Sequence, residues 1–148
     1  MSKLEKIRKA GMILFANNQI EADFKGFPGT TDPRLIACIL QLAAMHEEWM
    51  FYITSGSRTV EHNAEIGGVP DSGHVVEPEP GKKRPLTAFD IVISNVKDKS
   101  YLTKDEKQQI KEYLQYWWED LFDFVIYNKD EHIHLEVDTP FRKNPKEE

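Results

Sequence analysis

Two histidines stand at alternate positions near the end of the sequence, in the stretch D-E-H-I-H-L-E-V-D at 130–138. Successive side chains of a strand point to opposite faces, so His132 and His134 would project from the same face. Two acids, Glu131 and Glu136, stand beside them. Imidazole nitrogens and carboxylate oxygens both bind zinc. If that face lines a cleft, the stretch could therefore contribute to a metal site.

Further possible ligands lie upstream. His74 occurs in D-S-G-H within a polar segment, and Asp90 occurs in A-F-D-I-V-I, where a carboxylate is poorly suited to a core. A catalytic zinc takes ligands from several elements and keeps one position for a water molecule. Taken singly, each residue has an ordinary explanation as a solvated loop histidine, a turn-capping aspartate or a packed strand histidine. We expect His46 to be structural and His62 to brace a loop.

Composition limits the classes of protein and partner. The chain has 148 residues, 40% of them hydrophobic, which suffices for one domain with a packed core. A net charge of −6 disfavours binding to nucleic acid or to an anionic membrane. The single cysteine, Cys38, excludes a disulfide framework and is expected to be a buried apolar residue. We expect no membrane span and no signal peptide, hence synthesis in the cytosol.

The pattern of apolar and turn-forming residues predicts the secondary structure. In chain order we expect an amphipathic helix containing Leu4, Ile7, Leu14 and Phe15, a loop over 16–31, a helix from Asp32 with Pro33 in its first turn, a strand over 49–55, an irregular segment over 55–85, a strand over 86–94, a helix with a Thr103–Glu106 capping box, and a hairpin over 122–137. This order predicts an α+β fold with a small, mostly antiparallel sheet packed by helices.

We expect a single domain over 1–148. Its parts would be a helical N-terminal part over 1–50, a functional core over 51–138 and a frayed tail over 139–148.

Five short motifs occur in a fixed order between Ser55 and His134: S-G-S-R, H-N-A-E-I-G-G, S-G-H, A-F-D and E-H-I-H. In this order they resemble the zinc peptidases of the D-alanyl-D-alanine carboxypeptidase superfamily, which cleave peptidoglycan stem peptides and include phage endolysins. The resemblance implies a Hedgehog/DD-peptidase-like fold with a zinc cleft. It also implies that His74, Asp90 and His134 bind one Zn²⁺.

The resemblance implies roles for other residues as well. Glu131, three residues before the last ligand, would be the general base. Glu136, which strand alternation places on the same face as His132 and His134, is a weaker rival for that role. Arg58 would steady the substrate and the developing oxyanion, because a guanidinium offers fixed paired donors. Ser72 would hydrogen-bond the substrate, and His132 would line the cleft.

The sequence departs from the family pattern between His74 and Asp90, where the family usually has a much shorter step. Leu86 takes the place of the family's glycine. The insertion, roughly Val76 to Pro85, would lie beside the site as a lid or substrate wall. Its K-K-R could meet anionic carboxylates of stem peptides or wall polymers. A solvated excursion is the alternative.

The resulting prediction is a zinc metallopeptidase that hydrolyses an amide bond in peptidoglycan stem or cross-link peptides, using zinc-activated water and a glutamate base. It would be a monomer of phage or prophage type, acting on the wall after release or as a virion part. The alternatives are a peptidase-like binding module without turnover and a structural virion component. The sequence leaves open D,D against L,D cleavage and endo- against carboxypeptidase action.

Overall fold

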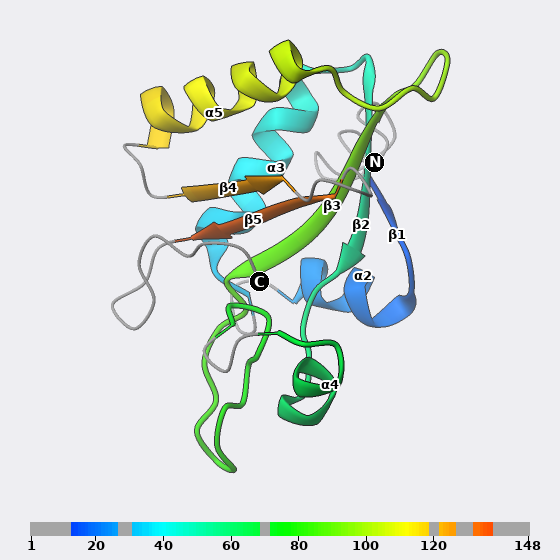
Figure 1. Cartoon of the computed structure of the whole chain (residues 1–148). Coiled ribbons are helices and arrows are strands. Elements are labelled where there is room, and N and C mark those ends of the chain that lie inside the picture. Colours follow the sequence, from blue (N-terminus) through cyan, green and yellow to red (C-terminus); the bar gives the residue numbers. More distant parts are fainter. Residues whose placement is uncertain (1–12, 27–30, 69–71, 119–121, 127–131, 138–148) are drawn as a thin grey trace.

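The computed structural model describes residues 13–26, 31–68, 72–118, 122–126 and 132–137 (Figure 1), and the backbone alone for 122–126. Its elements are β1 (Ile13–Phe15), α2 (Asn18–Lys25), α3 (Pro33–Met45), β2 (Trp49–Ser55), α4 (Val60–Glu65), β3 (Ala88–Asn95), α5 (Lys104–Trp118), β4 (Phe122–Ile126) and β5 (Ile133–Val137). The predicted tail, the hairpin turn and the start of the predicted first helix lie outside the described residues.

The strands form one five-stranded mixed sheet in the order β1-β2-β3-β5-β4. β1 runs parallel to β2, and the other three neighbouring pairs are antiparallel. Figure 1 shows β3 as a long curved strand through the middle, with β2 and β1 on one side and β5 and β4 on the other. The register of β3 and β5 places Asp90 directly opposite His134. Two of the predicted ligands are thus neighbours in the sheet.

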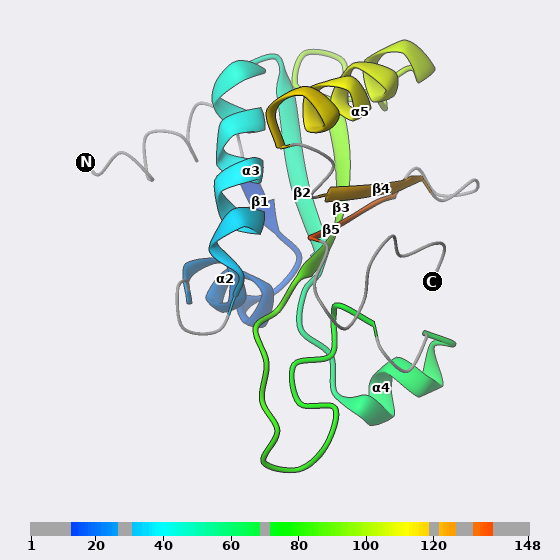
Figure 2. The same ribbon diagram turned by 90° about the vertical axis from the view of Figure 1, so that its left-hand side faces the viewer.

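One face of the sheet carries the apolar core. Figure 2 shows α3 lying along this face, and α3 and α5 contribute core side chains such as Ile39 and Ile110. Side chains alternate along β3, so Phe89 and Ile91 enter the core while Asp90 points to the opposite face. The predicted α+β fold of a sheet packed by helices is confirmed in this form. The Hedgehog-like architecture stays a prediction.

The predicted start of α3 is confirmed. The side chain of Asp32 accepts a hydrogen bond from the backbone N–H of Arg34, and Pro33 occupies the first turn. The predicted capping box of α5 is present too. Glu106 N–H donates to Oγ1 of Thr103, and Thr103 N–H donates to Oε1 of Glu106.

The predicted helix over Leu14 and Phe15 is wrong, because Ile13–Phe15 forms β1 beside β2. The alternation of buried Ile13 with Leu14, which is 47% exposed, has the period of a strand. The predicted loop over 16–31 is also wrong, because it contains α2. Asn17 caps that helix by accepting from the N–H of Ile20, a capping signal that is present in N-N-Q-I within the predicted loop.

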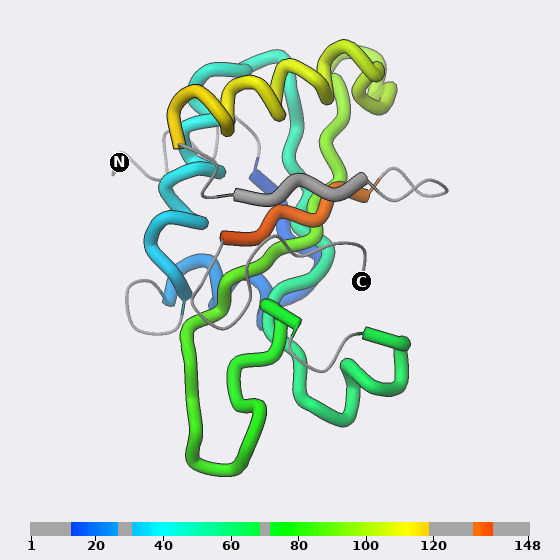
Figure 3. Tube along the Cα trace, turned by 60° about the vertical axis from the view of Figure 1, so that its left-hand side comes forward, coloured from blue at the N-terminus to red at the C-terminus, as the bar shows by residue number. Residues whose placement is uncertain are grey.

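The insertion folds back on itself at the end of the molecule where β2 ends and β3 begins (Figure 3). The N–H of Arg84 donates to the carbonyl of Val76 at 2.8 Å, and the N–H of Lys82 donates to the carbonyl of Glu79 at 2.9 Å. Gly81 provides the positive φ, 80°, at the tip. Because its two limbs are joined, the extra length leaves the ends of the loop close together. α4 lies beside it, within a segment predicted to be irregular.

In the described part of the chain, every helix is too short or too polar to cross a membrane.

Candidate metal centre

Three side chains converge on the sheet face opposite the core: His74, Asp90 and His134. Nε2 of His74 lies 3.2 Å from Oδ1 of Asp90, and Nδ1 of His134 lies 2.9 Å from the same oxygen. One potential ligand atom from each residue lies within 4.8 Å of the other two. His74 and His134 are fully buried and Asp90 is 8% exposed. The structure thus brings together all three predicted ligands.

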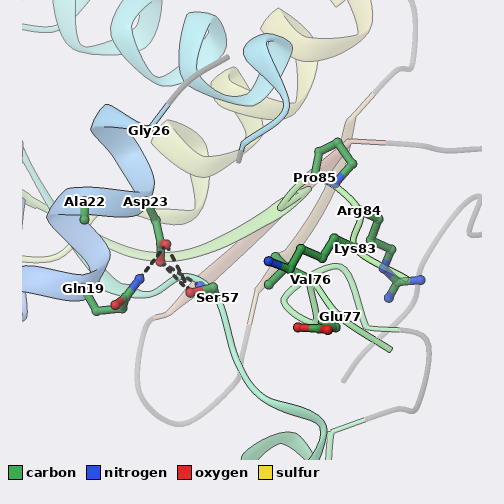
Figure 4. Close-up of a pocket in the computed structure, with 10 residues that line it drawn as sticks. All are labelled: Gln19, Ala22, Asp23, Gly26, Ser57, Val76, Glu77, Lys83, Arg84 and Pro85. Atoms are coloured by element: carbon green, nitrogen blue, oxygen red, sulfur yellow. Dashed lines mark hydrogen bonds between the residues drawn. The ribbon is translucent and has the colours of Figure 1, made fainter. Parts of the chain in front are cut away.

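His74 is oriented by the turn that follows β2. Its Nδ1 lies 2.7 Å from the carbonyl oxygen of Gly56. A carbonyl can only accept, so Nδ1 carries a proton, and in the neutral ring Nε2 then directs its lone pair at Asp90. Asp23 of α2 anchors this turn by accepting from the N–H of Ser57 at 2.9 Å and from its hydroxyl (Figure 4).

Asp90 is held from its other side by Arg58. Nη2 of Arg58 donates to Oδ2 of Asp90 at 2.9 Å, and Nε donates to Oγ of Ser55 at 3.2 Å. Burial raises the pKa of the Asp90 carboxyl. The attraction of His74 and the hydrogen bonds from His134 and His74 lower that pKa by more, so it lies well below its ordinary value. Asp90 is therefore a carboxylate at neutral pH.

His134 has a carboxylate at each ring nitrogen. Nδ1 faces Asp90, and Nε2 lies 2.7 Å from Oε1 of Glu136, which is also fully buried. A neutral ring can donate to one of them only. When Nδ1 binds a metal ion beside Asp90, the proton of the neutral ring stands on Nε2 and Glu136 accepts it.

These tautomers fit a metal ion. Without an ion, a proton on either ring nitrogen can join it to Oδ1 of Asp90, which is the hydrogen bonding that lowers the pKa of that carboxyl. With both rings neutral, Oδ1 faces two nitrogen lone pairs, and a cation takes the place of those protons. Ligand atoms about 2.0–2.1 Å from one tetrahedral Zn²⁺ stand roughly 3.3 Å apart, close to the observed 2.9 and 3.2 Å. Two imidazoles and one carboxylate form the three-ligand set of a catalytic zinc with one open position.

The other predicted site residues have different surroundings. Ser72 is fully buried, and its Oγ accepts from the N–H of His74 at 3.2 Å, which braces the turn carrying that ligand. Its contact with substrate stays a prediction. His132 is half-buried and is not part of the three-residue group. Glu131, the predicted general base, lies outside the described residues, so its role also stays a prediction.

The remaining histidines and the cysteine lie apart from the group. His46 stacks on Trp49 with ring centroids 3.7 Å apart, which fits the structural role expected for it. The His62 side chain is 58% exposed on α4. Cys38 is fully buried, as predicted, and burial raises the pKa of its thiol, so it is not a thiolate ligand.

Sequence reasoning missed the positioning role of three groups: the Gly56 carbonyl, Asp23 and Glu136. A backbone carbonyl carries no sequence signal. Asp23 stood in a segment predicted to be a loop, so nothing connected it to the S-G-S-R turn. Glu136 was noticed by alternation, but as a rival base. The structure places it at Nε2 of His134, away from the nitrogen that faces Asp90.

Two neighbouring cavities lie between the insertion and the S-G-S-R turn. The first, about 590 Å³, is bounded by α2, Ser57 and the insertion residues Val76, Glu77, Lys83, Arg84 and Pro85 (Figure 4). The second, about 640 Å³, shares Ser57, Val76 and Glu77 and adds Arg58 and the start of α4. None of the three possible ligands lines either cavity. Arg58, which contacts Asp90, connects the second cavity to the metal centre.

The geometry is that of a protein with a possible His-Asp-His metal site. The sequence profile described as Peptidase M15 matches residues 14–136, which include every element of the sheet and all three possible ligands. The chain belongs to the Peptidase M15 family, whose members are zinc-dependent, and it is a zinc metallopeptidase by that membership. No curated protein and no solved structure gives a significant match.

Removing either imidazole should abolish stoichiometric zinc binding. We expect about one zinc per purified chain, and far less after His74→Ala or His134→Ala, because two protein ligands hold the ion poorly. His62→Ala is the matched control, since that ring is exposed outside the group. Elemental analysis with a circular dichroism spectrum of each variant measures this. Equal loss from the control, or a zinc-free folded parent, would contradict the assignment.

Proposed function

We propose that this zinc metallopeptidase hydrolyses an amide bond in peptidoglycan stem or cross-link peptides, as a monomeric wall-lysis enzyme of phage or prophage type. Its site of action would be the cell wall, reached after release or as part of a virion. The observation that carries the peptidase part is the buried group of His74, Asp90 and His134 with Arg58 at its edge. The wall substrate is supported by the order of the five sequence motifs.

A zinc ion bound by the three ligands would lower the pKa of a water molecule toward ~7 and polarise a peptide carbonyl. Glu131 would accept the proton of that water and deliver it to the leaving nitrogen as the C–N bond breaks. Arg58 holds Asp90 and also lines the second cavity, so its guanidinium borders both the ligand cluster and a place where part of a peptide could lie. It can offer a donor to a carbonyl oxygen that gains negative charge.

The insertion would serve as the substrate wall. It supplies residues to both cavities, whose volumes are in the range of ligand sites. Its three basic residues differ in their contacts. Lys82 pairs with Glu79 at 2.8 Å, and Arg84 donates to the carbonyls of Val75 and Ser72. Lys83 lines the first cavity and is thus the one placed to meet a carboxylate of a stem peptide (Figure 4).

Digestion of purified peptidoglycan tests the proposed reaction. The zinc-loaded parent should release peptide fragments, and their masses identify the bond cut. Glu131→Gln should lower kcat by about 10²- to 10⁴-fold while zinc content is kept, because proton transfer is lost and the metal ligands are not. Glu65→Gln, on the exposed end of α4, is the control.

Two outcomes contradict this proposal separately. If Glu131→Gln is as fast as the parent, Glu131 is not the general base. A zinc-loaded parent that binds walls and releases no fragment would favour the peptidase-like binding module.

Substitution of Lys83 tests the role of the insertion. Lys83→Ala should raise KM for a carboxylate-bearing stem peptide about two- to fivefold with kcat nearly unchanged, the size of one exposed ion pair. Lys82→Ala is the matched neighbour, because Lys82 pairs with Glu79 within the loop. Steady-state kinetics on both variants measures this. If Lys83→Ala and the parent have the same KM, the insertion is a solvent-exposed loop that does not contact the substrate through Lys83.

A further inference from the structure

We propose that Glu136 is a positioning residue of the metal centre. It holds the Nε2–H of His134 and so presents Nδ1 of that ring to the ion. The contact that carries this is 2.7 Å long, between Oε1 of Glu136 and Nε2 of His134, and both side chains are 1% exposed or less. The inference rests on the zinc site alone and not on the wall substrate.

The position of Glu136 suits the orientation of His134 and does not suit metal ligation or proton transfer at the ion. The contacts of His134 put Asp90 at one ring nitrogen and Glu136 at the other, so the imidazole separates Glu136 from the ligand cluster. Oε1 is therefore neither a fourth ligand nor a base for a water at the ion. A histidine ligand whose other N–H is held by a carboxylate has a fixed tautomer and ring orientation.

The surrounding backbone keeps the carboxylate in place. Ala88 lies opposite Glu136 in the register of β3 and β5, and its small side chain leaves room for a buried carboxylate. The backbone of Gly73 packs closely against the same carboxylate. A Cβ added at Gly73 would lie 2.7 Å from Cδ of Glu136 and 2.7 Å from Oγ1 of Thr87. The backbone N–H of Thr87 donates to the Gly73 carbonyl at 3.1 Å.

This packing connects the two imidazole ligands. Gly73 directly precedes His74, so the turn that carries one histidine rests on the carboxylate that orients the other. Glu136 thereby sets the ring of His134 by a hydrogen bond and limits the approach of the His74 turn by contact. The contact thus joins the S-G-H stretch, which contains Gly73 and His74, to the H-L-E stretch, which contains His134 and Glu136.

The test measures zinc affinity of the full chain by competition with a chromophoric chelator. Glu136→Leu removes the acceptor and should weaken zinc binding about 10- to 100-fold. Glu136→Gln keeps an acceptor without the charge and should weaken it about 3- to 10-fold, because charge-assisted hydrogen bonds are the stronger ones. Glu112→Leu and Glu112→Gln, on the exposed face of α5, are matched controls and should keep parental affinity.

A second readout separates positioning from stability. The visible spectrum of the Co²⁺-loaded protein reports the ligand field, so it should change in both Glu136 variants and not in the Glu112 variants. Zinc affinity and a cobalt spectrum equal to the parent's in folded Glu136→Leu would overturn the proposal, as would equal losses in Leu and Gln. If Glu136→Leu does not fold, Glu136→Gln decides: parental affinity and spectrum overturn the proposal, and a 3- to 10-fold loss supports it.

Discussion

The arrangement depends on one buried oxygen, Oδ1 of Asp90, which faces a ring nitrogen of His74 and another of His134. A buried anion is costly unless it is compensated. Arg58 compensates the other oxygen of the same carboxylate, and a cation between Oδ1 and the two nitrogens would complete the balance. Each ligand also has its own orienting partner: the Gly56 carbonyl for His74, Arg58 for Asp90 and Glu136 for His134.

The sheet places the residues around Oδ1 of Asp90 on one of its two faces. Alternation along β3 and β5 sends the apolar side chains to α3 and leaves the other face for Asp90, His134 and Glu136. The turn bearing His74 then covers that face, and α2 fixes the neighbouring turn through Asp23. The described N-terminal residues, which contribute none of the three possible ligands, are in this way connected to the geometry of the site.

The sequence predicted correctly those elements that are specified by residues close together in the chain. The Asp32 cap, the Thr103–Glu106 box and the β-branched run of β3 each act within a few residues, and each was predicted correctly. β1 was not, because a three-residue strand is specified by its partner β2 and not by its own length. α2 was missed although Asn17 supplies a local capping signal. The ligands were found through the order of motifs. Two of their orienting groups, the Gly56 carbonyl and Asp23 of a distant helix, become visible only in three dimensions, and Glu136 was identified on the correct strand face but for another role.

The central claim is that His74, Asp90 and His134 hold one zinc. X-ray absorption at the zinc edge of the loaded protein tests it most directly. The account predicts two imidazole nitrogens and further oxygen ligands, all at about 2.0–2.1 Å, with no sulfur. A shell with a sulfur at about 2.3 Å, or with no imidazole signature, would contradict it.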